Sequence, residues 1–383
     1  MKKVLFIQNN GSTSGGVWSV NKTLALHLKR LGYDTLALSI REKFKIKDVP
    51  DELSIYTINK KDKWIVPQRR EIKEDIKSYR FIKAIKKIIQ NKKRFLDIKK
   101  TKKFIKKFNP DYIVASHYQV LDGIPKEYLR KTINVHHNTY DYALKDKNNI
   151  KIWNKYNGKI TFAWLSKATM EIAKKKGLVN NVCMYNPVKF LSRASADVTN
   201  NKRLIVLTRM VEEKRLDLMI KIVEKIFEDK KFKDWKFYLY GDGILKKQIK
   251  KGITNHHQVI FKEPTQDAKK AYLKGSINLN TSSYEGFPMS ILEASECGVP
   301  TVTFNYGESS KEQVIHEKTG IIVPQDDVPA FIEALKDLMS SKRKLKSMSK
   351  ECKLYNEIFS VKKITQDWIN LFKEIDLKGE KND

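Results

Sequence analysis

The first half of the chain alternates short apolar runs with stretches in which apolar residues recur at helical spacing. Buried strands separated by helices are typical of a parallel sheet with helices on both faces. The first helical stretch covers residues 17–31, and a glycine-containing loop precedes it. We therefore predict a doubly wound α/β domain over residues 1–185, with strands at residues 4–8, 35–39, 111–116, 133–136 and 160–165.

The same alternation restarts in the second half of the chain. Residues 186–203 are polar, contain a proline and lack periodicity, which predicts a linker. A second Rossmann-like domain is expected over residues 186–360, facing the first across a cleft. Its predicted elements are strands at residues 203–208, 236–240, 258–261, 277–280 and 301–304, and helices at residues 216–227 and 290–297.

The C-terminal segment carries an apolar stripe at helical spacing. Ile364, Trp368, Leu371 and Phe372 lie on one face of a helix predicted for residues 361–375. We assign residues 361–383 to a helix and tail that pack back across the domains.

Composition favours a cytoplasmic protein. No run of eighteen apolar residues is present, and the apolar stretch at residues 4–7 is too short for a signal peptide. The three cysteines, Cys183, Cys297 and Cys352, form no paired spacing, as expected in a reducing compartment.

The positive charge is concentrated in the first half. The whole chain has a formal net charge of +32, but residues 1–185 hold 41 Lys and Arg against 16 Asp and Glu. Residues 186–383 hold 35 against 28. Lysine-rich usage can reflect genome composition, yet it would not confine the excess to one half. An anionic partner is expected for that half: nucleic acid, a membrane surface or an acidic polymer.

Two carboxylates in the segment YEGFPMSILEASECGVP, residues 284–300, carry the most specific chemistry. Glu285 follows a predicted strand, which places it at the sheet edge where open α/β folds bind ligands. Glu293 lies one turn into the following helix, where it can accept hydrogen bonds from ribose hydroxyls. The first amides of this helix suit a phosphate: those of Met289, Ser290 and Ile291.

This segment resembles the retaining glycosyltransferases of family 4, which have the GT-B fold. Their two glutamates are spaced as in EGFPMSILEA here. The resemblance implies that Glu285 is catalytic and lies against the donor sugar. It also implies that Glu293 holds the donor ribose, and that residues Gly286, Phe287 and Pro288 contribute to the donor-sugar site.

A second block, IVLTRMVEEKRLDL at residues 205–218, resembles the stretch with which this family binds the donor diphosphate. The family's cations correspond to Arg209 and Lys214, which would stabilise the leaving nucleoside diphosphate. Thr208 and Arg215 replace two glycines of the family pattern, and Arg215 adds bulk and charge beside the expected phosphate site. The stretch YGDGILKKQI, with Gly241 and Gly243, follows in the family's order.

The first half resembles the family less closely. Gly16 follows the first strand in the position of the family's paired-glycine loop, where backbone can approach the donor phosphate. His136 and His137 follow a predicted strand at the place where the family puts a catalytic histidine near the transferred sugar. The sequence leaves open which of them faces the cleft. His117 follows another strand and is assigned to the acceptor side, and Asn186 with Pro187 resembles the family's hinge.

The most basic stretch, residues 80–107, contains thirteen Lys or Arg and one acid. Residues 95–108 are interpreted as a packed helix, and residues 79–94 as a surface arm that meets an anionic leaflet or a phosphate-rich polymer. Its assigned acceptor contacts are Arg80, Lys83, Lys86 and Lys87.

These features together predict a retaining transferase with a nucleotide-sugar co-substrate, UDP being the family's commonest nucleotide, and an anionic lipid-linked or polymeric acceptor. No Asp-x-Asp metal motif is suitably placed, so neither a divalent metal nor another cofactor is expected. Peripheral association with the inner face of the membrane is compatible with the charge. The alternative, a polyanion- or nucleic-acid-binding protein without catalysis, leaves the paired glutamates without a role. A phosphorylase, an inverting transferase and an inactive paralogue fit these motifs less well.

Overall fold

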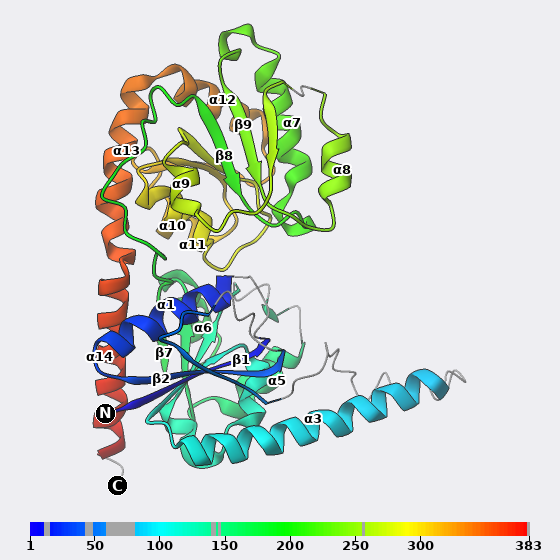
Figure 1. Cartoon of the computed structure of the whole chain (residues 1–383), viewed down its shortest axis with the longest axis vertical. Coiled ribbons are helices and arrows are strands. Elements are labelled where there is room, and N and C mark those ends of the chain that lie inside the picture. The colour runs from blue at the N-terminus through cyan, green and yellow to red at the C-terminus, as the bar shows by residue number, and fades with distance from the viewer. Residues whose placement is uncertain are drawn as a thin grey trace.

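The computed structural model describes residues 1–10, 16–42, 49–58, 81–138, 143–144, 147–254 and 257–380. The chain forms two domains, each built on one parallel sheet with helices on both faces (Figure 1). This is the predicted fold class. Residues 184–202, between the sheets, form neither helix nor strand, as expected for a linker.

The first sheet has seven strands in the order β3-β2-β1-β4-β5-β6-β7, all parallel. All five predicted strands are present, and most of their ends lie within two residues of the predicted ends. The two additional strands are short edge strands whose side chains are at most half-buried, so they lack the apolar run that marks a central strand. The strands are β1 (Lys3–Asn10), β2 (Asp34–Glu42), β3 (Ser54–Thr57), β4 (Tyr112–Ser116), β5 (Thr132–His136), β6 (Thr161–Trp164) and β7 (Asn181–Cys183).

Two apolar cores flank the first sheet. Alternate residues of β1 enter opposite cores: Val4 and Phe6 one, Leu5 and Ile7 the other. The helices that complete these layers are α1 (Gly16–Arg30), α3 (Phe81–Phe108), α5 (Lys147–Tyr156) and α6 (Lys167–Lys175), with 3-10 turns η2 (Tyr118–Gly123) and η3 (Lys126–Lys131).

The second sheet has six parallel strands in the order β10-β9-β8-β11-β12-β13. Its edge strand β13 was not predicted. The strands are β8 (Arg203–Leu207), β9 (Lys236–Tyr240), β10 (Val259–Lys262), β11 (Ile277–Asn280), β12 (Thr301–Phe304) and β13 (Gly320–Val323). The helices are α7 (Leu216–Phe227), α8 (Lys246–Lys251), α9 (Ala268–Tyr272), α10 (Met289–Glu296), α11 (Glu308–Gln313) and α12 (Val328–Ser340), with turns η4 (Glu212–Lys214) and η5 (Lys230–Phe232).

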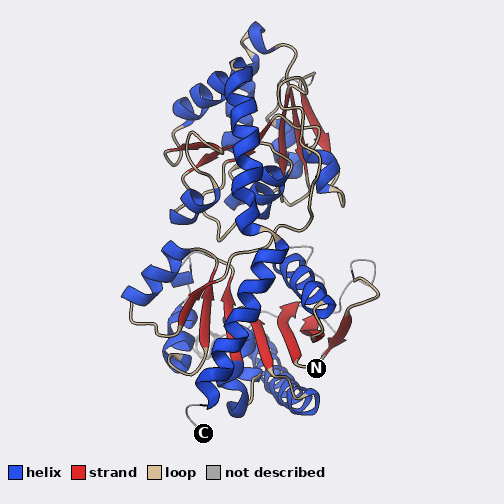
Figure 2. Cartoon of the chain, turned by 90° about the vertical axis from the view of Figure 1, so that its left-hand side faces the viewer, coloured by secondary structure: helices blue, strands red, loops and turns tan. Residues whose placement is uncertain are grey.

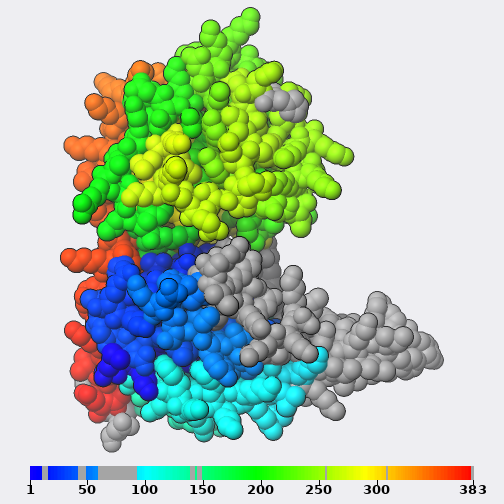
Figure 3. Space-filling view, viewed as in Figure 1, coloured from blue at the N-terminus to red at the C-terminus, as the bar shows by residue number. Residues whose placement is uncertain are grey.

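The C-terminal helices run along one side of both domains (Figures 2 and 3). Helix α13 (Lys342–Asn356) packs on the second domain, and α14 (Val361–Glu380) packs on the first, after the turn η6 (Glu357–Phe359). Trp368 and Phe372 of α14 lie in the same core as Val4, and Phe372 stacks on Tyr112 with ring centroids 4.2 Å apart. The predicted helix that returns across the domains is confirmed.

Helix α3 is continuous over 28 residues and projects from the first domain (Figure 1). Near its C-terminal end, Ile105 is buried and the ring of Phe104 stacks on Tyr56 at 4.5 Å, as the prediction of a packed segment requires. Arg80 lies outside the described residues, as do the side chains of Lys83, Lys86 and Lys87. None of the helices in the described ranges has both the length and the hydropathy that a membrane span needs.

Candidate active site

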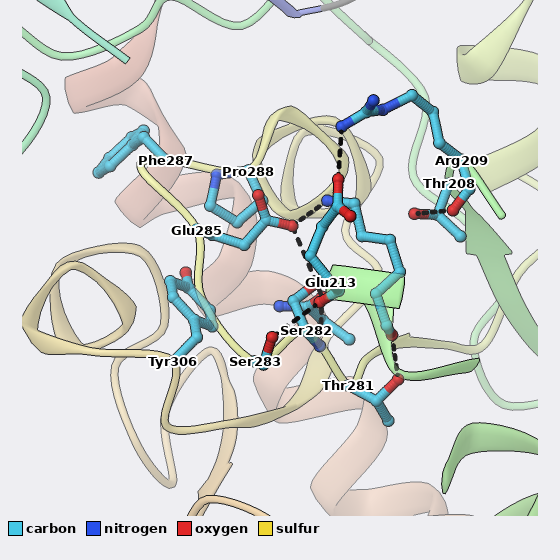
Figure 4. Close-up of polar contacts among 12 residues, drawn as sticks. Thr208, Arg209, Glu213, Thr281, Ser282, Ser283, Glu285, Phe287, Pro288 and Tyr306 are labelled. Carbon is cyan, nitrogen blue, oxygen red and sulfur yellow. Dashed lines mark hydrogen bonds and ion pairs between the residues drawn. The ribbon is translucent and has the colours of Figure 1, made fainter. Parts of the chain in front are cut away.

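The centre of the candidate site is an ion pair between two loops of the second domain. Lys214, at the end of η4, pairs through Nζ with Oε1 of Glu285, and each side chain is about 15% exposed. Ser282 donates its hydroxyl to the same carboxylate oxygen at 2.9 Å (Figure 4). Thr281 donates to the backbone oxygen of Lys214 at 2.9 Å. The predicted cation and the predicted catalytic carboxylate are therefore brought together, and hydrogen bonds from neighbouring residues support both.

Arg209 lies on the loop that follows β8 and is more exposed. Its guanidinium pairs with Glu213 at 3.1 Å, and its side chain is 66% exposed (Figure 4). The two predicted diphosphate ligands thus share one loop but differ in environment, since one is enclosed and the other can move toward a ligand.

Two glycines hold this loop in place. A Cβ on Gly241 would lie 1.9 Å from the carbonyl oxygen of Thr208, and a Cβ on Gly243 would lie 2.3 Å from that of Met210. Backbone hydrogen bonds also join the segments, with the Met210 amide donating to the Asp242 carbonyl at 2.8 Å. Only glycine permits this approach, so these residues shape the Arg209 loop through packing of the backbone.

Arg215, which replaces a glycine of the resembled pattern, keeps a left-handed backbone with φ 46° and ψ 44°. Glycine adopts this conformation readily, whereas arginine does so at a cost. Its guanidinium pairs with Asp217 at 3.3 Å and with Asp326 at 3.1 Å. The added charge is therefore matched by two carboxylates, and the local turn is retained.

The start of α10 corrects one of the predicted phosphate contacts. The helix begins at Met289, after Pro288, one residue earlier than predicted. The amide of Ile291 donates to the Pro288 carbonyl at 3.3 Å, so Ile291 has an internal partner. Met289 and Ser290 remain the candidate amide donors. A Cβ on Gly16 would lie 3.7 Å from Cγ of Met289, which brings the first residue of α1 beside them.

Glu293 is 4% exposed and has a partner that the sequence did not suggest. Lys189, on the linker between the sheets, places its Nζ 2.7 Å from Oε1 of Glu293. Burial, and after it the charge of Glu293, raises the pKa of Tyr272 well above its usual value, which indicates that this hydroxyl lies near the carboxylate. A lysine three positions after the Asn186 hinge has no motif of its own, so only the folded chain reveals Lys189.

The segment between the two glutamates meets the first domain. A Cβ on Gly286 would lie 2.0 Å from the carbonyl oxygen of His137, so the two domains touch backbone to backbone here. Phe287 is 4% exposed and packs against Tyr185 and Phe359 at centroid distances of 5.4 Å. Its ring therefore anchors the hinge, and the contribution of Phe287 to the donor-sugar site stays a prediction. The Pro288 carbonyl also accepts from Gln313, at 3.1 Å.

The two adjacent histidines have different environments. His136 is buried between Trp153 and Trp164, and its Nε2 accepts a hydrogen bond from the Trp153 indole at 2.9 Å. Burial lowers the pKa of His136 to about 3. This corrects the assignment of His136 as a catalytic candidate, because its ring is held in the core of the first domain. His137, whose backbone touches Gly286, is the one beside the Glu285 segment.

His117 lies beside His137, in a group of neutral histidines and not on a basic surface. Its ring centroid lies 5.5 Å from that of His137, and Nε2 of His137 lies 3.3 Å from the Ser116 hydroxyl. Burial lowers the pKa of all three histidines, so each is neutral near pH 7. His117 also has φ 71° and ψ 147°, a conformation that costs a non-glycine residue about 1–3 kcal/mol and that is concentrated at functional sites.

A metal site is not evident in these loops. Within the described ranges, no three His, Cys, Asp or Glu side chains lie close enough together to hold an ion.

Comparisons with known proteins place the chain among proteins of similar sequence and fold. Residues 188–355 match the family described as glycosyl transferases group 1. An uncharacterized glycosyltransferase of Haemophilus influenzae is 24% identical over 96% of this chain and 99% of its own length. A poly(ribitol-phosphate) alpha-N-acetylglucosaminyltransferase of Staphylococcus aureus is 26% identical over 70% of this chain, which spans about half of that relative (53%).

Solved structures show the same architecture. A crystal structure of a TarM mutant from S. aureus, in complex with Fondaparinux, alpha-GlcNAc-glycerol and UDP, superposes with a TM-score of 0.75. The match covers 97% of this chain and 100% of that one at 14% identity. The chain therefore has the GT-B fold, and its residues 188–355 are similar to glycosyl transferases group 1.

Proposed function

We propose that this protein is a retaining glycosyltransferase of family 4 that moves a hexose or N-acetylhexosamine from a nucleotide sugar to an anionic acceptor of the cell envelope. The observation that carries this proposal is the enclosed Lys214–Glu285 pair, set where the Glu285 segment meets the first domain at His137. A cation beside a carboxylate at a domain junction suits a sugar diphosphate, whose sugar hydroxyls and phosphate need opposite partners.

On the donor side, Arg209 and Lys214 would bind the diphosphate, together with the amides of Met289 and Ser290 and the backbone near Gly16. Glu293 would accept hydrogen bonds from the ribose hydroxyls. Its present partner, Lys189, would then serve as the counter-ion that a buried carboxylate needs. UDP is the proposed nucleotide, and the UDP complex of the structural relative supports this choice.

Transfer with retention would proceed on one face of the sugar. The bond from the anomeric carbon to the leaving phosphate oxygen breaks, and the acceptor oxygen bonds to that carbon from the same side. The acceptor proton passes to the leaving phosphate oxygen. Lys214 and Arg209 would stabilise the charge that develops on the phosphate, which is a metal-independent role. Glu285, already bonded to Lys214 and Ser282, is placed to orient the sugar hydroxyls, with His137 close by.

For the acceptor we propose a phosphate-rich polymer or a lipid-linked glycan, bound by the first domain (residues 1–185 in our division). The excess of basic residues in this half supports an anionic acceptor, and so does the polymer that gives the poly(ribitol-phosphate) relative its name. Phe95 and Leu96 of α3 are more than half exposed beside exposed lysines, which suits peripheral contact with the anionic inner leaflet. His117, next to His137, would lie where the acceptor hydroxyl enters.

A donor screen tests the proposal. Binding and slow hydrolysis of UDP-, GDP- and ADP-sugars would be measured with the wild type, Glu293→Ala, and the exposed control Glu333→Ala on α12. We expect one nucleotide series to bind, with affinity falling about ten- to a hundredfold in Glu293→Ala and unchanged in the control. If no nucleotide sugar bound the wild type, the proposed function would be wrong.

A further inference from the structure

A carboxylate of the second domain completes the start of a helix in the first. Glu312 of α11 accepts the amide of Lys167 through Oε2 and that of Ala168 through Oε1, each at 2.9 Å. These are the first two residues of α6, and the amide of its third residue, Thr169, is capped within the first domain by Ser166 at 3.1 Å. Two of the amides that a helix start leaves unpaired are therefore satisfied by the other domain.

The hydrogen bonds from α6 to Glu312 are strong, but water can replace them. A carboxylate that accepts two backbone amides forms charge-assisted hydrogen bonds, and the positive end of the helix dipole favours it further. The Lys167 amide is at an exposed position, so water could replace Glu312 if the domains separated. The bond can therefore bias the distance between domains without making them one rigid unit.

The same carboxylate is tied to the hinge. The hydroxyl of Tyr185, at the start of the linker, donates to Oε2 of Glu312 at 2.7 Å, and burial together with this bond raises the pKa of Tyr185 above its usual value. The Tyr355 hydroxyl donates to the Glu312 backbone carbonyl at 2.8 Å. Tyr185 also packs on Phe287, which lies between the two glutamates of the candidate site.

Helix α11 also directly contacts residues 285–288, which belong to the proposed donor site. Gln313, the next residue after Glu312, donates to the Pro288 carbonyl at 3.1 Å and accepts from the Tyr306 hydroxyl at 2.8 Å. Ser309 donates to the carbonyl of Glu285 at 3.4 Å. A six-residue helix thus touches the catalytic candidate on one side and α6 of the first domain on the other.

We propose that Glu312 is a positioning residue that latches the two domains in the closed form and so holds Gly286 against His137. The role in transfer rests on the proposed function, whereas the latch itself does not. Closure of the domains brings His137 to the donor sugar only when α11 and residues 285–288 are in their present positions. Glu312 thereby couples the positions of residues 285–288 to the closure of the two domains.

The test measures domain closure and catalysis separately. Small-angle X-ray scattering with and without UDP, and steady-state kinetics with the identified donor, would compare wild type, Glu312→Ala, Glu312→Gln, Tyr185→Phe and the control Glu333→Ala. We expect Glu312→Ala to have a larger radius of gyration than wild type and a kcat lower by about ten- to a hundredfold. UDP affinity should change less than about twofold, because all the proposed side-chain ligands, Arg209, Lys214 and Glu293, belong to the second domain, and the first domain contributes only backbone near Gly16.

The side chain introduced by Glu312→Gln has one acceptor oxygen and can replace the carboxylate at only one of the two backbone amides. Its effects on the radius of gyration and on kcat should therefore be intermediate. The effects of Tyr185→Phe should be smaller. Glu312→Gln also covers the case in which Glu312→Ala does not fold. Unchanged scattering and unchanged kcat in the folded Glu312 variants would overturn the latch. A chain without any transferase activity would refute the proposed function, while the scattering would still decide whether Glu312 closes the domains.

Discussion

The two walls of the candidate site are built in different ways. The wall from the second domain presents charged side chains in pairs, Lys214 with Glu285 and Arg209 with Glu213, on loops that short motifs encode. The described wall from the first domain presents glycine backbone and the neutral imidazole of His137. The difference teaches that the charged groups of the candidate site come from the second domain, whereas the described surface that the first domain brings to Gly286 is neutral.

The same comparison separates bulk charge from the site. The first half of the chain carries +25 of the net charge of +32, yet the His137 that it brings to Gly286 is uncharged near pH 7. Exposed lysines such as Lys99 and Lys100 lie instead on α3. Net charge therefore indicates a class of partner, but it does not locate the reacting groups.

The largest expected effect comes from the charged wall. Lys214→Met should lower the rate of sugar transfer by about a hundred- to a thousandfold, because it removes an enclosed cation beside the leaving phosphate. Arg209→Ala should cost less, since that side chain is largely exposed. Single-turnover rates with saturating donor would measure both, with the exposed Lys221→Ala as control. Equal losses in the two variants would contradict the distinction between enclosed and exposed cations.

An intermediate effect should separate the two histidines. His137→Ala should lower kcat about tenfold with little loss of stability, because its ring lies beside the site. His136→Ala should instead lower the free energy of unfolding by about 1–3 kcal/mol, since the Trp153 indole loses its buried acceptor. Urea unfolding and kcat of the folded enzymes would be measured for each. The reverse pattern would show that His136 is the functional residue.

The smallest effect concerns the exposed lysines of α3. Raising the salt concentration from 50 to 500 mM should raise the acceptor KM about three- to tenfold, while the donor KM changes less, because exposed charges are screened more than enclosed ones. The double substitution of Lys99 and Lys100 by Glu should reproduce part of this change at low salt. An acceptor KM that does not respond to salt would exclude an acceptor bound by surface charge.

Local patterns predicted much of the fold and one wall of the site. Central strands are buried on both faces, so their apolar runs are visible in the sequence, whereas the edge strands β3 and β7 carry no such signal. Glu285, Lys214 and Gly286 have the predicted positions because short motifs specify a loop and the helix after it. The division of the chain at residues 185 and 360 stays a prediction.

The amino-acid sequence by itself determined the residue types, the order of strands and helices, and the loops on which the charged groups lie. Only the tertiary structure decided the partners of the buried polar groups. Lys214 and Glu285 are 71 residues apart in the sequence, and Glu312 and Lys167 are 145 residues apart. Lys189 lies in the linker, whereas its partner Glu293 lies in α10. Adjacent histidines also diverged, one into the core and one to the site. The physical reason is that spacing constrains neighbouring backbone, whereas the environment of a buried side chain depends on distant segments that packing brings together.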